Sequence, residues 1–309
     1  MASTLFALAL AAIVAFSLPP PSNADEASYS TITYHGGPVL SSPKGINLYL
    51  VWYGSFSHNE KATIIDFLSS FAPQGSPSQE PSVSTWWKAT SSYKGKNGRP
   101  VASTVRVARR VGDMYSLGKK LTRSQIADIV KGRISAKKLP VDRNGIYLVL
   151  TSKDVAVERF CMSSCGFHES FVAAGGVQLV YGHVGDPAAQ CPGMCSWPFA
   201  VPAYGPPGGP LVAPNGVGVD GVVMNIATVL AGAATNPFKN GYFQGDRLAP
   251  LEAVTACPGV FGEGAYPGFP GKLMMSSDQA SFNVYGGNGR RFLLPAMWDL
   301  GTATCKVLS

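Results

Sequence analysis

The stretch INLYLVWYGSFSHNE, residues 46–60, decides the fold of this chain. Its first eight residues, 46–53, form a continuous apolar and aromatic run, which predicts a buried strand. Ser57 follows, and Glu60 lies three residues further on, at the spacing of a helix capping box. A buried strand that leads directly into a helix is typical of α/β proteins.

The rest of the chain continues this alternation of strands and helices. We expect strands over 46–53, 104–111, 146–152 and 176–183, and helices over 57–71, 82–93, 121–132 and 219–238. A second capping box, Thr122 with Gln125, begins the third helix, and Gly132 is its predicted stop. Residues 184–218 and 262–271 are rich in Gly and Pro and predict long loops. The fold class is therefore α/β, with a mixed, mostly parallel sheet flanked by helices and long, disulfide-bonded loops.

The predicted helix over 219–238 is apolar on all sides, so we expect it at the centre of the fold. Asp220 is its expected N-terminal cap, and Asn236-Pro237 its end. We expect this helix to be too short to span a membrane.

The N-terminus indicates export. Residues 1–24 contain no Lys, Arg, Asp or Glu, and an apolar run over 5–18 precedes small residues at Ser22 and Ala24. This pattern predicts a secretory signal peptide, 1–24, cleaved after Ala24. The mature chain, 25–309, is then expected to be a single secreted domain with no membrane span, located in the extracellular space.

Six cysteines raise a choice between zinc and disulfides. Two Cys-x₃-Cys pairs lie 30 residues apart, with His168 and His183 between them, a spacing that zinc sites permit. An even number of cysteines in an exported chain favours three disulfides instead. We expect Cys257 to pair with Cys305 and the other four to pair among themselves. The six predicted disulfide residues are Cys161, Cys165, Cys191, Cys195, Cys257 and Cys305.

The net charge of +7 is unevenly distributed. Residues 94–143 hold 14 of the 25 basic residues and three of the 18 acidic ones. This asymmetry predicts a polyanionic partner, and in an exported protein we expect acidic polysaccharide or lipid headgroups rather than nucleic acid. The alternative is a solvated surface that serves only solubility. Candidate binding residues are Arg106, Arg109, Arg110, Lys119, Lys120 and Arg123.

The motifs of catalysis are incomplete. His168-Glu169 begins a HExxH pattern, but Val172 stands where the second histidine would be, so a loop histidine is the preferred interpretation. His35 and His183 are further weak candidates, with structural roles as the preferred interpretation. The chain has no Gly-x-Ser-x-Gly elbow and no phosphate-binding loop. We therefore predict no catalytic residue, no metal ligand and no cofactor.

Two further sets of residues could bind or cleave a glycan. The carboxylates Glu158, Glu169, Asp186 and Asp220 could supply a glycosidase acid pair. The aromatic residues Trp86, Trp87, Tyr93, Tyr242, Phe243, Tyr266 and Phe269 could stack on sugar rings, although core packing is the preferred interpretation.

Several blocks together resemble the plant EXORDIUM family, also called phosphate-induced protein 1: YHGGPVL (34–40), STWWKATSSY, CGFHES, NPFKNGYFQGD, LEAVTACPGVFGEGAYPGFPG and NGRRFLLPAMWD. The resemblance covers the mature chain. It implies a secreted protein of the apoplast or cell wall, linked to brassinosteroid-promoted growth and cell expansion.

One departure from this family concerns metal binding. Some relatives carry a His-Glu-x-x-Glu pattern in the helix that corresponds to 226–236. Here Thr228, Val229 and Gly232 occupy those places, and the last two offer no ligand. We therefore expect binding rather than catalysis. The alternatives are a secreted hydrolase, metallopeptidase-like or glycan-directed, with a degenerate site, and a secreted signalling protein that binds a receptor.

Overall fold

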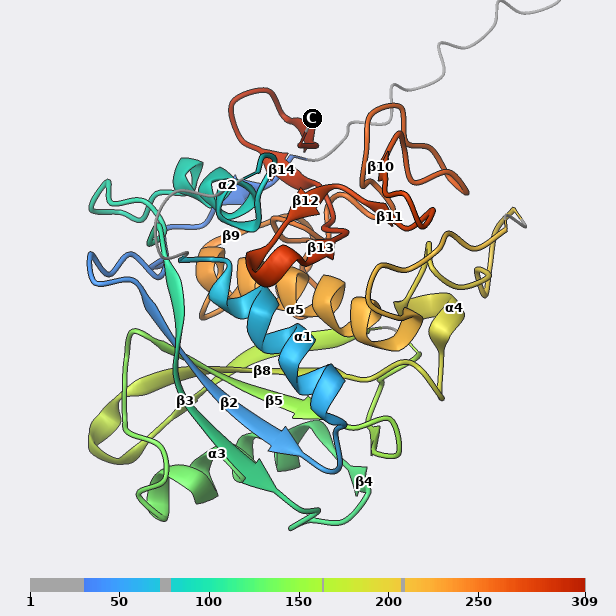
Figure 1. The fold of residues 1–309 in the computed structure, drawn as a ribbon. Coiled ribbons are helices and arrows are strands. Elements are labelled where there is room, and N and C mark those ends of the chain that lie inside the picture. The colour runs from blue at the N-terminus through green and yellow to red at the C-terminus, as the bar shows by residue number, and fades with distance from the viewer. Residues whose placement is uncertain (1–30, 73–78, 163, 207–208, 309) are drawn as a thin grey trace, which may run out of the picture. The chain divides into compact units, whose positions relative to one another are not determined.

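Five strands form the main sheet, in the order β3-β2-β5-β8-β7 (Figure 1). They are β2 (Ile46–Tyr53), β3 (Val105–Asp113), β5 (Gly145–Thr151), β7 (Gly166–Val172) and β8 (Gln178–Gly185). The first three and β8 are parallel, and β7 pairs antiparallel with β8 at one edge. The predicted mixed, mostly parallel sheet is confirmed. This computed structural model describes residues 31–72, 79–162, 164–206 and 209–308, so the predicted signal peptide, 1–24, lies outside the described residues.

Two helices begin at the predicted capping boxes. α1 (His58–Ser69) starts after Ser57, whose side chain accepts from the Glu60 amide while its own amide donates to the Glu60 carboxylate. α3 (Arg123–Ser135) starts in the same way after Thr122. The predicted stop at Gly132 is wrong: α3 continues for another turn because Ile134 still packs against the core beneath the helix.

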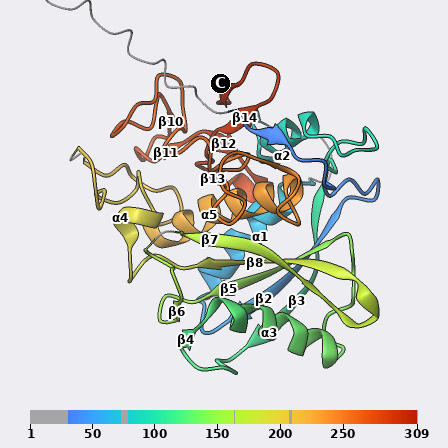
Figure 2. The same cartoon turned by 180° about the vertical axis from the view of Figure 1, so that it is seen from behind.

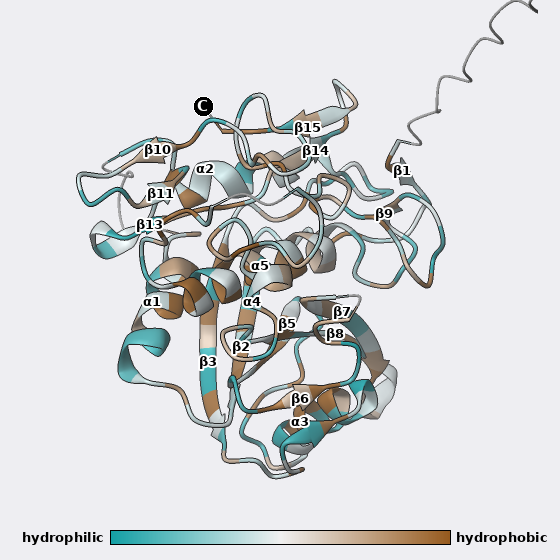
Figure 3. Ribbon diagram, turned by 90° about the vertical axis from the view of Figure 1, so that its right-hand side faces the viewer, coloured by the Kyte–Doolittle hydropathy of each residue, from teal (hydrophilic) through white to brown (hydrophobic). Residues whose placement is uncertain are grey.

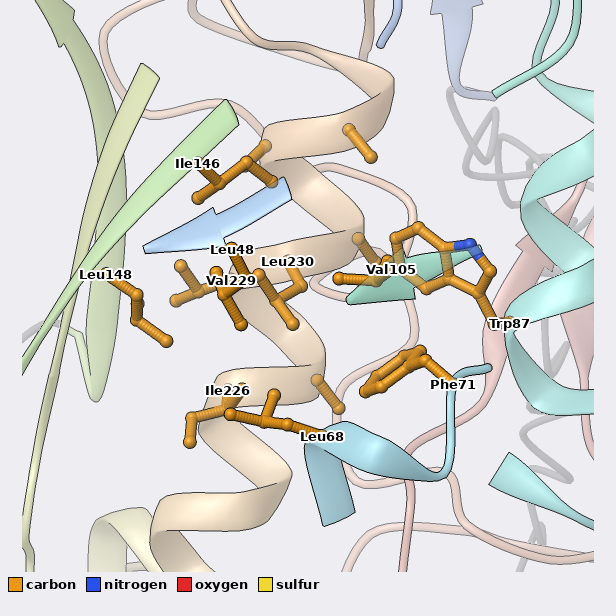
Figure 4. Close-up of a cluster of buried hydrophobic side chains, with 14 of the residues drawn as sticks. Leu48, Leu68, Phe71, Trp87, Val105, Ile146, Leu148, Ile226, Val229 and Leu230 are labelled. Atoms are coloured by element: carbon orange, nitrogen blue, oxygen red, sulfur yellow. The ribbon is translucent and has the colours of Figure 1, made fainter. Parts of the chain in front are cut away.

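The central helix is α5 (Val217–Thr235), which packs on the sheet beside α1 (Figures 1 and 4). Its side chains Ile226, Val229 and Leu230 meet sheet residues such as Leu48 and Leu148. By length and composition alone α5 could cross a membrane, contrary to the prediction that it is too short. However, 78% of its apolar window is buried inside the protein, as a core helix requires.

The two ends of α5 differ in how well they were predicted. The helix ends before Asn236-Pro237, as expected. The prediction of Asp220 as the N-terminal cap is wrong, because Gly216 occupies that position and Asp220 lies in the first turn. Asp220 instead accepts hydrogen bonds from the backbone and side chain of Asn215, at 2.7 and 2.8 Å.

Both faces of the sheet are covered, and β2 contributes to two cores. Leu48, Leu50 and Trp52 pack with α1 and α5 in one cluster. The alternate residues Tyr49, Val51 and Tyr53 pack with α3 in the other. Figure 3 shows the apolar colour along α1, α5 and the inner strands. This two-sided burial explains why the run 46–53 has no polar face.

The remaining elements are short and lie mostly on the side of α1 and α5 away from the sheet (Figures 1 and 2). The predicted helix 82–93 is α2 (Val83–Lys88) followed by a 3₁₀ turn, Ala89–Ser92. The other elements are α4 (Pro192–Cys195), β1 (Thr33–Tyr34), β4 (Lys120–Leu121), β6 (Ala156–Val157), β9 (Tyr242–Phe243), β10 (Met274–Met275), β11 (Ser281–Phe282), β12 (Val284–Tyr285), β13 (Arg291–Phe292), β14 (Met297–Asp299), β15 (Thr304–Lys306) and two 3₁₀ turns, Ala174–Gly176 and Gly287–Gly289.

Three disulfides join the six cysteines. Cys257 pairs with Cys305, as predicted, and the other pairs are Cys161–Cys191 and Cys165–Cys195. We call the latter two the twin disulfides, because both span 30 residues and their ends lie four positions apart. Since every sulfur is bonded to another sulfur, the cysteines cannot ligate zinc.

Candidate functional site

A β-bulge on the edge strand β3 brings two candidate arginines to one face. Arg106 pairs with Asn47 and Arg109 with Tyr49, so Ala108 is the extra residue between them. Without the bulge, positions 106 and 109 would point to opposite faces, because side chains alternate along a strand. With it, both arginines lie on the face that α3 covers.

The C-terminal end of α3 adds further basic residues to these arginines. The Arg109 guanidinium donates to the Lys138 carbonyl oxygen at 3.1 Å, which places Lys137 and Lys138 beside β3. Arg106 donates to Asn47 at 2.9 Å. All four basic side chains are exposed. We call Arg106, Arg109, Lys137 and Lys138 the α3-end surface.

The other predicted basic residues lie elsewhere. Lys119, Lys120 and Arg123 precede or begin α3, so its 13 residues separate them from the α3-end surface by roughly 20 Å. The Arg123 guanidinium lies 3.8 Å from the centre of the Phe167 ring. Arg110 pairs with Leu50, whose side chain faces α1, so it lies on the opposite face from Arg109. The six candidates therefore do not form one surface.

Lys119 belongs to a network at the carboxyl edge of the sheet. Its ammonium group lies 2.6 Å from the Asp154 carboxylate, which also accepts from Ser152 and Tyr115. These hydrogen bonds, that of Lys119 first, hold the pKa of Asp154 far below its ordinary value. The chain reverses its direction of strand addition between β2 and β5, the place where open α/β sheets commonly bind ligands. In this protein Lys119, Ser152 and Tyr115 bind the Asp154 carboxylate at that edge of the sheet.

Two of the candidate histidines lie on opposite faces of the sheet. His168 pairs with Gly182 on β8, and a side chain at Gly182 would meet Val229 of α5. His183 pairs with Phe167, and its ring contacts Phe160 and Phe167 in the core under α3. The sheet therefore separates the two rings, and they cannot act on one substrate.

His183 and His35 have local structural partners. The His183 ring lies 2.9 Å from the Thr151 hydroxyl, and burial, aided by the charge of Arg123, lowers its pKa to about 3. It is therefore neutral at physiological pH. The His35 ring stacks on Phe243 with 3.8 Å between centroids, at the surface pairing of β1 with β9.

His168 is not the loop histidine that we predicted. It lies on β7, buried, with Nε2 2.9 Å from both carboxylate oxygens of Glu252. Asn236 donates to the same carboxylate at 2.7 Å. Burial raises the pKa of Glu252, but the charge and hydrogen bond of His168 outweigh it and leave that pKa below its ordinary value. The expectation failed because β7 has mixed burial and no regular alternation.

Gly232 makes room for this buried pair. A β-carbon at this position would lie 2.5 Å from the Glu252 carboxylate and 3.1 Å from the His168 ring. Thr228 and Val229 occupy the other two positions where some relatives carry the His-Glu-x-x-Glu pattern. Val229 packs against β7 and β8, and Thr228 donates to the Met224 carbonyl oxygen. Among the described residues no cluster of three or more His, Cys, Asp or Glu side chains could hold a metal ion.

The four candidate carboxylates make separate contacts. Asp186 and Asp220 lie near the first turn of α5, where a β-carbon at Gly218 would be 3.1 Å from Asp186. Asp186 accepts from the Ala188 amide. Glu158 accepts from the Arg123 amide, and Glu169 lies 3.6 Å from Lys239. Sequence reasoning missed Glu252, which stands in an apolar stretch with no catalytic spacing around it.

Burial raises the pKa of Asp220 to about 6, despite the hydrogen bonds from Asn215. The folded protein therefore binds this proton more tightly than the unfolded chain does. Relative to Asp220→Asn, the wild type should lose free energy of unfolding as the pH rises from about 4 to about 6. We expect a change on the order of 2–3 kcal/mol, measured by chemical denaturation of both proteins across this range. A constant difference between the two proteins would contradict the prediction.

The candidate aromatic residues fall into two groups. Trp86, Trp87, Tyr93, Tyr242 and Phe243 are buried, as the core interpretation predicts. Tyr266 is 65% exposed and Phe269 is half-buried. Only these last two of the seven remain available to a ligand.

Comparisons with known proteins agree with the sequence blocks that resemble the EXORDIUM family. The family model for the phosphate-induced protein 1 conserved region matches residues 32–308. Protein EXORDIUM of Arabidopsis thaliana is 45% identical over 293 residues, which cover 91% of this chain and 90% of that protein. EXORDIUM-like 2 of the same plant is 46% identical, over 89% and 88% of the two chains. Protein PHOSPHATE-INDUCED 1 of Nicotiana tabacum is 43% identical, over 90% and 88%. No solved structure matches.

Proposed function

The chain belongs to the phosphate-induced protein 1 family, and on that premise we propose that it is a secreted protein of the plant apoplast that binds acidic cell-wall polysaccharide. Its role would be in brassinosteroid-promoted growth and cell expansion, through binding rather than catalysis. The names of its relatives do not indicate an enzyme. The N-terminal pattern of residues 1–24 supports export.

The observation that carries this proposal is the α3-end surface. The bulge at Ala108 puts Arg106 and Arg109 on one face, and Lys137 and Lys138 lie beside them. Guanidinium groups bind carboxylates through paired hydrogen bonds, and lysines add positive charge at a flexible reach. A polyuronide presents carboxylates along one chain, so several such contacts can form at once. Figure 3 shows the polar segment in the middle of β3.

The hydrolase alternative has no comparable support. Within the described part of the chain, no hydrogen bond or ring contact joins any two of His35, His168 and His183. The sheet lies between the latter two.

Chromatography on immobilised polygalacturonate tests the proposal. We expect the mature protein to elute late in a salt gradient, because exposed charges are screened progressively as salt rises. Changing Arg106, Arg109, Lys137 and Lys138 to Gln should move elution to much lower salt. Changing Lys119 and Lys120 to Gln should have a smaller effect, because Lys119 is already paired with Asp154.

The matched control removes four other exposed charges. Lys88, Lys96, Lys153 and Lys306 are exposed and lie outside the α3-end surface. Their change to Gln lowers the net charge equally, so this variant should elute close to the wild type. Equal shifts of both four-residue variants would refute a specific surface. Applied to growing seedlings, only the α3-end variant should lose any effect on cell elongation that the wild type has.

A further inference from the structure

A rigid turn presents two aromatic rings at the surface. In the sequence Tyr-Pro-Gly-Phe, residues 266–269, the Tyr266 amide donates to the Phe269 carbonyl at 3.0 Å, and the Phe269 amide donates back at 2.8 Å. Pro267 and Gly268, with φ at +90°, occupy the central positions of a type II turn. The two rings lie 5.1 Å apart between centroids. Proline and the paired hydrogen bonds restrict the turn before any ligand arrives.

A second loop lies against this turn and completes a cavity. A β-carbon at Gly268 would lie 3.3 Å from Pro206, so the loop after α4 contacts the turn directly. The cavity has a volume of about 330 Å³. Its lining includes Trp197, Leu211, Phe269, Pro270, Leu273 and Met275. Trp197 is half-buried, with its ring 5.9 Å from Phe261, so it forms a fixed wall.

Large apolar side chains are exposed on these two loops and on the cavity wall. Tyr204, on the loop after α4, is 82% exposed, Tyr266 of the turn is 65% exposed, and Met275 of β10, which lines the cavity, is 62% exposed. Apolar residues gathered in this way around a hollow indicate a binding site, whereas single exposed apolar residues do not.

We propose that this cavity and the Tyr266–Phe269 turn bind the pyranose rings of a neutral glycan. Among the described residues of its lining, Lys272 carries the only charge, and a single cation is too few to match the repeated carboxylates of a polyuronide. Flat aromatic faces suit the C–H face of a sugar ring, and the volume lies at the lower end of small-molecule sites, about 300–1,000 Å³. The site shares no residue with the α3-end surface, so the protein would hold two kinds of wall polymer independently.

Affinity gel electrophoresis with soluble xyloglucan, and separately with polygalacturonate, tests this proposal. At about 1 M salt the screening length is about 3 Å, so binding to polygalacturonate should disappear while retardation by xyloglucan persists. Tyr266→Ala with Phe269→Ala should weaken xyloglucan binding by roughly tenfold or more. Tyr266→Phe should retain it, because the ring face remains.

Two control variants test whether binding is confined to this site. Val172→Ala with Leu248→Ala removes exposed apolar surface elsewhere and should leave xyloglucan binding unchanged. The α3-end variant should also bind xyloglucan normally, so the two proposals can fail separately. Wild-type protein that is not retarded by xyloglucan, or a double aromatic variant that is retarded equally, overturns the inference. It is also overturned if sedimentation shows a wild-type dimer that the aromatic variant converts to monomer, because the patch is then a protein interface.

Discussion

Loss of both twin disulfides is expected to lower the free energy of unfolding by about 6 kcal/mol. In the chain-entropy account, one bridge across 30 residues contributes about 3.6 kcal/mol. The second then closes a ring of only about eight further residues, which contributes about 2.5 kcal/mol. Replacing Cys161 and Cys191 by Ser should therefore cost only about 2.5 kcal/mol, because Cys165–Cys195 still closes the same long loop.

Denaturant unfolding of the oxidised proteins measures these differences. Cys257→Ser with Cys305→Ser is the matched control, because that bridge spans 48 residues without a twin and should contribute about 4 kcal/mol. The loss of both twins should exceed the sum of the two single losses. A double loss equal to or smaller than that sum would contradict the sharing of one long loop by the two bridges.

Glu252→Ala is expected to destabilise the protein by about 3–5 kcal/mol. The change leaves His168 buried beneath α5 without its carboxylate and removes the acceptor of the Asn236 side chain. A buried polar or charged group that loses its partner cannot regain water, so the desolvation cost remains. Thermal and chemical denaturation of the variant, with intact disulfides, provide the measurement.

Glu169, which follows His168 in the sequence, supplies the control. It lies on the same strand as His168 and contacts Lys239 at 3.6 Å, but its side chain is 39% exposed. Glu169→Ala should therefore cost less than about 1 kcal/mol. In the double variant His168→Leu, Glu252→Ala, the unpartnered ring is absent, so the loss should be smaller than in Glu252→Ala alone. A double variant that is less stable than Glu252→Ala would contradict the penalty assigned to the unpartnered ring.

Short-range sequence patterns predicted the elements that are stabilised by neighbouring residues. The run 46–53 is buried on both faces, and the capping boxes at Ser57 and Thr122 use neighbours three residues away. Pairing of Cys257 with Cys305 was also predicted. The sequence left open how the four cysteines of the twin disulfides pair, and the structure shows it.

Features that depend on distant residues could not be predicted in this way. Strand β7 is stabilised by its pairing with β8, and His168 meets Glu252 across 84 positions of sequence. The α3-end surface depends on a single bulged residue, Ala108, and no local sequence pattern predicts this bulge. Charge counting therefore indicated a basic region, but it could not show that the six candidate residues divide among three places.

The irregular edge of the sheet has a consequence for the protein's behaviour at high concentration. An exposed edge strand offers unpaired amide and carbonyl groups, to which a neighbouring molecule can add a strand and begin a fibre. On β3, Ala108 interrupts the regular pairing, and Arg106, Arg109 and Arg110 place positive charge along the same segment. Approaching copies would repel one another, and β3 would not offer them a regular strand to pair with. This edge should therefore resist aggregation even where the protein is concentrated.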